Sequence, residues 1–206
     1  MRAELRPSLR AGLVVATGVS AVVFVWLAVV VWHAHGLVAL DGTYGLSLRN
    51  TRLERVALLG SPQVVLPVVG VGAVAWWLRG DRFAAVLCAV GPALAGLCET
   101  GAKHVVGRTA HSALSYPSGH VTLAAALTAV VAVLSFRAWR WRAAAAVTLV
   151  VAVVPLVVGV ALVRLGWHFP TDVVGGAALG VGVVSGVAVL LAWGSDLRDR
   201  TTHSAM

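Results

Sequence analysis

Residues 117–136 read PSGHVTLAAALTAVVAVLSF, a polar tetrapeptide followed directly by an apolar run. The run over 119–136 is close to the roughly 20 residues with which an α-helix crosses a bilayer. Burying polar groups at a membrane boundary costs free energy, so the tetrapeptide Pro117-Ser118-Gly119-His120 needs a reason to stand there. The stretch therefore predicts a membrane helix that begins at a functional site.

Five further apolar runs accompany this one, at roughly 11–33, 56–78, 83–103, 143–164 and 171–193. The composition agrees with membrane spans, because 59% of the residues are hydrophobic and 12% charged, whereas a soluble domain carries about 25% charged residues. The first run is longer than the apolar core of a signal peptide, so we expect it to be retained. We predict an all-α fold, a bundle of six transmembrane helices that forms a single domain over 1–206.

The basic residues that give the chain its net charge of +8 fall in the short connections between the runs. Membrane topology explains such cations better than nucleic-acid binding does. With cytoplasmic N- and C-termini, ten cations lie inside and six outside, a moderate positive-inside bias. This orientation predicts a multi-pass protein of the cell membrane. Three connections then share the extracytoplasmic side: residues 34–55, the connection between the third and fourth runs, and the connection between the fifth and sixth runs. Arg49, Arg52 and Arg55, three residues apart, indicate a short interfacial helix in the 34–55 connection.

The connection between the third and fourth runs carries candidate phosphate ligands. Lys103 is the only lysine beside fifteen arginines, and Arg108 follows it; both groups suit a phosphate clamp. The first amides of a helix have no internal partner and attract anions, so Ser118 and Gly119 can bind phosphate oxygens. Glu99 lies one helical turn before Lys103, and we expect it to be a structural partner of that lysine. The alternatives are a lysine that snorkels from its helix end and an ordinary serine cap.

A second polar stretch, RLGWHFPTD at 164–172, opens the last apolar run. Proline suits the first position of a helix, so the last span begins at about Pro170 and Asp172 lies in its first turn. Asp172 can then accept a hydrogen bond from one ring nitrogen of His168, which leaves the other as nucleophile or base. Arg164 shares the face of His168 if the segment stays helical. The alternative is an interfacial histidine beside an aspartate at a helix start.

His120, His168 and Asp172 are also conceivable as three metal ligands. The chain has no HExxH motif and no closely spaced His/Cys pair, and the nearby cationic groups would repel a divalent ion. We therefore expect neither a metal nor another cofactor.

Together these residues resemble the type-2 phosphatidic acid phosphatase family, whose site is shared with vanadium haloperoxidases. The family pattern is a lysine followed after six residues by Arg-Pro, then Pro-Ser-Gly-His, then Ser-Arg, five residues, His, three residues and Asp. Lys103, the tetrapeptide at 117–120, His168 and Asp172 match it in order and spacing. The resemblance spans about 103–172, and the six-span plan extends it to the whole chain.

Two parts of the family pattern are absent. Ala110-His111 stands in place of Arg-Pro, and Ala161-Leu162 in place of Ser-Arg. Arg108 and Arg164 each lie two residues from a missing arginine, so they are candidates to restore its positive charge. A shift of two residues turns a side chain by about 200° around a helix, so the replacement is not equivalent.

The resemblance implies a metal-independent, two-step hydrolysis of a phosphomonoester or diphosphate of a lipid. His168 would attack phosphorus and form a phosphohistidine, Asp172 would orient it, and His120 would protonate the leaving alkoxide and then activate water. The groups expected to stabilise the phosphoryl oxygens are Lys103, Arg108, Arg164, Ser118 and Gly119.

The expected substrate is a polyprenyl phosphate or diphosphate, phosphatidic acid or a related lipid, reached from the extracytoplasmic side. Two alternatives stay open: a lipid phosphotransferase with the same intermediate, and a catalytically silent membrane protein that binds phospholipid. A transporter is disfavoured, because Glu99 is the only charged residue expected deep within a span.

Overall fold

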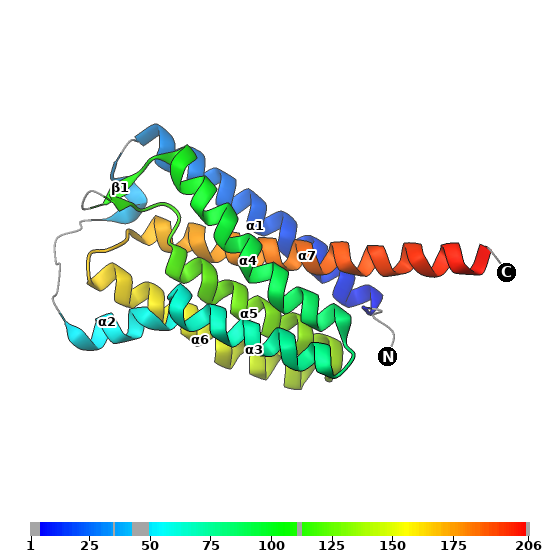
Figure 1. The fold of residues 1–206 in the computed structure, drawn as a ribbon. Coiled ribbons are helices and arrows are strands. Elements are labelled where there is room, and N and C mark those ends of the chain that lie inside the picture. Colours follow the sequence, from blue (N-terminus) through cyan, green and yellow to red (C-terminus); the bar gives the residue numbers. More distant parts are fainter. Residues whose placement is uncertain (1–4, 35, 43–49, 111–112, 205–206) are drawn as a thin grey trace.

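The computed structural model describes residues 5–34, 36–42, 50–110 and 113–204, without the side chains of 198–204. Its α-helices are α1 (Pro7–Ala34), α2 (Thr51–Ala57), α3 (Pro62–Leu78), α4 (Arg82–Val106), α5 (Gly119–Ala138), α6 (Trp141–Arg164) and α7 (Pro170–Ser204). Short elements lie between them: the 3-10 turns η1 (Ala39–Asp41) and η2 (Leu58–Gly60), and the antiparallel strands β1 (Thr109–Ala110) and β2 (Ala113–Leu114). The helices run side by side as one bundle (Figure 1).

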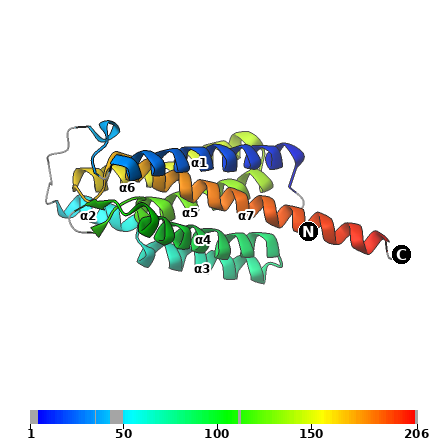
Figure 2. The same ribbon diagram turned by 90° about the horizontal axis from the view of Figure 1, so that it is seen from above.

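The predicted six-span plan is confirmed. Within the described ranges, six helical segments are long and apolar enough to cross a membrane. Each segment contains one of the predicted runs, and the segment bounds differ from the predicted ones by a few residues. Both termini lie at one end of the bundle, and the hairpin of β1 and β2 lies at the other (Figures 1 and 2). The chain is therefore a multi-pass membrane protein, with both polar stretches of the sequence at the end away from the termini.

The second span is interrupted near its start. Asn50 caps α2 by accepting hydrogen bonds from the amides of Arg52 and Leu53, and η2 joins α2 to α3. The predicted interfacial helix corresponds to α2, which leads directly into the span; Arg49 lies outside the described residues. Pro62 begins α3, whereas Pro67, Pro92 and Pro155 lie inside continuous helices.

Helix α7 packs against α1, α4 and α5, and α5 packs in turn against α6. Glycines on α7 allow its close contact with α5. A methyl group at Gly176 would lie 2.5 Å from the Ser118 carbonyl oxygen, and one at Gly180 would overlap the backbone of Thr122. The first turns of α5 and α7 are thereby held together, and these turns carry the two halves of the candidate site.

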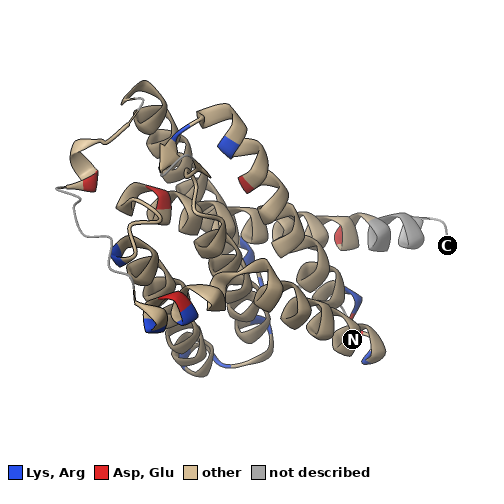
Figure 3. Ribbon diagram, turned by 60° about the vertical axis from the view of Figure 1, so that its left-hand side comes forward, with Lys and Arg blue, Asp and Glu red and all other residues tan. Residues whose placement is uncertain are grey.

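Ion pairs connect helices at both ends of the bundle, where the charged residues gather (Figure 3). Near the termini, Arg137 pairs with Asp81, and Arg10 with Asp196. Further pairs lie at the opposite end, around the two polar stretches, and these shape the site.

Candidate active site

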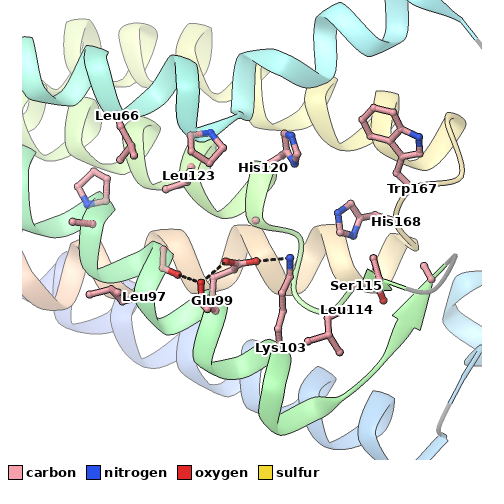
Figure 4. Close-up of a pocket in the computed structure, with 18 of the residues that line it drawn as sticks. Leu66, Leu97, Glu99, Lys103, Leu114, Ser115, His120, Leu123, Trp167 and His168 are labelled. Carbon is pink, nitrogen blue, oxygen red and sulfur yellow. Dashed lines mark hydrogen bonds and ion pairs between the residues drawn. The ribbon is translucent and has the colours of Figure 1, made fainter.

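A cavity of about 930 Å³ opens between α3, α4, α5 and the connection that follows α6. Figure 4 shows the imidazoles of His120 and His168 and the ammonium of Lys103 at one part of this cavity. Apolar side chains line it further along, among them Leu66, Leu97 and Leu123. The cavity therefore joins a polar pocket to an apolar groove between membrane-spanning helices.

Two glycines turn the chain where helices end beside the cavity. Gly107 follows α4 with φ 67° and donates its amide to the Lys103 carbonyl, and Gly166 follows α6 with φ 71°. This left-handed conformation strains any residue that has a Cβ. The turn at Gly166 leads into His168 and directs the chain toward the start of α7.

His168 and Asp172 form the pair that their spacing predicts. The His168 Nδ1 lies 3.4 Å from Asp172 Oδ2, and the same oxygen accepts the Phe169 amide at 3.0 Å. The Asp172 side chain is fully buried, whereas the His168 ring lines the cavity. A carboxylate held behind one ring nitrogen orients the ring and favours the tautomer with its proton on Nδ1.

Arg108 lies behind this pair and does not line the cavity. Its Nη1 donates to Asp172 Oδ1 at 2.9 Å and to Thr171 Oγ1 at 2.6 Å, and its Nη2 pairs with Asp41. The guanidinium carbon lies 4.1 Å from the ring centre of Phe169. Two buried carboxylates thus pair with Arg108, as a buried charge requires, and the structure does not bring it to the cavity with Lys103 as the sequence predicts.

Arg164 is also misplaced for a phosphate ligand. It is exposed and is not among the residues that line the cavity. Helix α6 ends at Arg164 and the chain reverses at Gly166, so the helical relation to His168 does not hold. Among the described Lys and Arg side chains, only Lys103 lines the cavity.

Within the tetrapeptide, Ser118 and Gly119 differ in what they present to the cavity. The Ser118 amide donates to the Asp172 carbonyl at 3.0 Å, so it is not available to a phosphate. The Ser118 side chain is fully buried, and its Oγ has no hydrogen-bond partner among the described residues. Gly119 begins α5 and lines the cavity together with His120, so the first turn of α5 faces the site from Gly119 onward.

Lys103 and Glu99 form the ion pair that their spacing predicts, with Nζ and Oε1 2.7 Å apart. Both residues line the cavity. A methyl group at Gly119 would lie 2.8 Å from Glu99 Oε1, so the glycine lets this carboxylate approach the start of α5. Glu99 is thus a structural partner that also places negative charge inside the site.

Sequence reasoning missed three residues around the site: Asp41, Thr171 and Ser115. Asp41 and Thr171 bind Arg108, and Ser115 lines the cavity. Asp41 follows the apolar residues Leu37-Val38-Ala39-Leu40, and a carboxylate after such a run is a signal of burial that could have been matched with Arg108. His111, at the departure from the family pattern, lies outside the described residues. Among the described residues, no group of three or more His, Cys, Asp and Glu is placed to hold a metal ion.

Comparison with known proteins supports the resemblance. The sequence model of the PAP2 superfamily matches residues 92–195, a region that contains Lys103, His120, His168 and Asp172. Among solved structures, the chain is similar to the first transmembrane PAP2 type phosphatidylglycerolphosphate phosphatase from Bacillus subtilis, with a TM-score of 0.59 and 21% identity over 93% of this chain and 95% of that one. That likeness shows the shared fold. A comparison with curated proteins gave no significant match. Because the family model covers half of the chain and both polar stretches, the chain belongs to the PAP2 superfamily.

Proposed function

We propose that this protein is a lipid-phosphate phosphatase that hydrolyses a phosphomonoester or diphosphate of a lipid. One observation carries the proposal: His168, backed by buried Asp172, faces the same cavity as His120 and Lys103, and the cavity continues along apolar side chains. A phosphate would occupy the polar part and a lipid tail the apolar part. The solved relative named above is a phosphatidylglycerolphosphate phosphatase, which supports the same class of substrate.

The reaction proceeds in two steps in this proposal. The Nε2 of His168 attacks phosphorus, the bond from phosphorus to the lipid oxygen breaks, and His120 donates a proton to the leaving alkoxide. His120 then takes a proton from water, the water oxygen attacks the phosphohistidine, and inorganic phosphate leaves. Asp172 holds the proton on Nδ1 of His168 and stabilises the charged ring while the phosphoryl group moves.

Charge on the phosphoryl oxygens is stabilised by fewer groups than the sequence indicates. Lys103 and the first turn of α5 from Gly119 onward face the site, whereas Arg108, Arg164 and the Ser118 amide do not. Preorganised donors of this kind are often the largest single contribution to catalysis. We therefore infer that Lys103 carries a greater share of transition-state stabilisation than any other cation of the chain.

The distribution of cations supports a site on the extracytoplasmic side. The sequence places ten cations in the connections near the termini and six at the site end. The positive-inside rule then favours cytoplasmic termini.

The experiment is phosphate release by purified protein in detergent from a panel of lipid phosphates, with EDTA present. We expect release that vanadate inhibits and that His168→Ala abolishes. His104→Ala is the matched control, because His104 is an exposed histidine of α4 outside the cavity lining. Release that survives His168→Ala refutes the mechanism. Phosphate that appears on an added alcohol instead of in solution identifies the phosphotransferase, and absence of both products identifies a silent protein.

A further inference from the structure

Asp41 is a buried carboxylate outside the cavity, in the connection between the first two spans. Its side chain is fully buried. Oδ1 accepts the Thr171 hydroxyl at 2.7 Å and the Thr171 amide at 3.2 Å, and Oδ2 accepts the Val38 amide at 3.2 Å and pairs with Arg108. The carboxylate thus binds the first turn of α7 and the segment after α4 at the same time.

Arg108 connects Asp41 to the catalytic pair. Its guanidinium stands between the carboxylates of Asp41 and Asp172, and neither carboxylate is exposed. Burial raises the pKa of Asp41, but the hydrogen bonds from Thr171 and Arg108 outweigh it, so the pKa lies below the ordinary 3.8. Asp41 is therefore ionised at neutral pH and holds the Arg108 guanidinium in place by an ion pair.

The position of Arg108 decides where Asp172 points. One carboxylate oxygen of Asp172 is bound by Arg108, and the other by the Phe169 amide and His168 Nδ1. A shift of Arg108 would release its hydrogen bond to Asp172 Oδ1, one of the contacts that set the 3.4 Å approach of Oδ2 to Nδ1. Asp41 is the other charged group that holds Arg108 among the described residues.

We propose that Asp41 is a positioning residue for His168, acting through Arg108 and Thr171 on Asp172. This inference rests on the proposed function, in which His168 is the nucleophile. It couples the 34–55 connection to the reacting group, although no atom of Asp41 touches the cavity. The loss expected from a displaced positioning group reaches about 100-fold when the geometry shifts by about 1 Å.

The first test is Asp41→Asn, which keeps the shape of the side chain and removes its charge. We expect kcat to fall about 10- to 100-fold while KM changes by less than about threefold, because the substrate cavity is untouched. Asp81→Asn is the matched control: it removes the ion pair with Arg137 at the other end of the bundle, while the Asn side chain can still cap the Ala84 amide. Both variants lose stability, but only Asp41→Asn loses kcat in this proposal.

A double-mutant cycle tests the route through Arg108. Asp41→Asn and Arg108→Gln together should lower kcat far less than the product of their separate losses, because both act on Asp172 through one contact. Independent losses, an unchanged kcat in folded Asp41→Asn, or an equal loss in Asp81→Asn overturns the proposal.

A measurement without turnover separates this inference from the proposed function. The ¹⁵N resonances of the His168 ring, assigned with His168→Ala in full-length protein in detergent, report the hydrogen bond at Nδ1. We expect the Nδ1 signal to move in Asp41→Asn and to stay in Asp81→Asn. If the wild type hydrolyses no lipid phosphate, the proposed function fails and this signal still decides the role of Asp41. An unmoved signal refutes the positioning role even when hydrolysis is confirmed.

Discussion

Replacing Glu99 by Gln should tighten anion binding at the site. The Glu99 carboxylate lies 2.7 Å from the Lys103 ammonium, and both groups face the cavity. A phosphate that binds Lys103 must therefore approach an ammonium that already has a negative partner. Gln keeps the shape of Glu, so the change removes the charge of the ion pair and little else.

The magnitude follows from the geometry. The Glu99 oxygen lies 2.7 Å from the Lys103 nitrogen. A phosphate oxygen placed at the same distance on the opposite side of that nitrogen would lie at twice 2.7 Å from the Glu99 oxygen. Two unit charges about 5 Å apart repel by about 1 kcal/mol at the dielectric constant of water and by about 3 kcal/mol at an effective value of about 20. One kcal/mol corresponds to about fivefold in a binding constant. We expect the inhibition constants of inorganic phosphate and vanadate to fall at least about fivefold.

The assay is competitive inhibition by both anions, measured at two ionic strengths. Glu54→Gln is the control, because Glu54 lies on α2 and does not line the cavity. It removes the same charge from the same end of the bundle. An inhibition constant that is unchanged or raised in folded Glu99→Gln, or lowered equally by Glu54→Gln, refutes the reasoning that Glu99 opposes phosphate at Lys103.

Three further changes follow from the same contacts. Arg164→Ala should alter kcat/KM by less than about threefold in the phosphate-release assay, since Arg164 is exposed and outside the cavity lining. Arg108→Ala should lower the free energy of unfolding by about 3–5 kcal/mol, measured by thermal unfolding, because it leaves the buried carboxylates of Asp41 and Asp172 without their cation. Asp41 has a folded pKa below the ordinary 3.8, so its contribution is present above about pH 4 and lost as pH falls through the folded pKa. The melting temperatures of wild type and Asp41→Asn should therefore converge in acid.

The spans and the His168–Asp172 pair were predictable because each depends on local sequence. Apolar length fixes the six helices, and the spacing of four residues with Pro170 at the helix start fixes the approach of Asp172 to His168. The Glu99–Lys103 pair is likewise one turn of a single helix. In each case the backbone geometry follows from residues that are close along the chain.

The roles of the cations were not predictable in the same way. Arg108 meets Asp41 across 67 residues and Asp172 across 64, and such contacts depend on how helices pack. A phosphate ligand and a buried ion-pair partner are both arginines beside polar residues, so the sequence pattern does not separate them. Helix α6 ends at Arg164, and the turn at Gly166 means that Arg164 and His168 do not share one helix face.

The two positions at which the family pattern places an arginine have different surroundings in this structure. Ala110 lines the cavity, so its position faces the site as the pattern implies and simply lacks a charge. Leu162 is fully buried in an apolar cluster with Val121 and Val158, where an arginine would leave an unpaired charge in the core. A second cation is therefore compatible with position 110 and incompatible with position 162. In the proposed function, Lys103 would bind the phosphate against the charge of Glu99, while Arg108 holds Asp172 from behind. On that proposal, the charge of the site supports the nucleophile more than it binds the substrate.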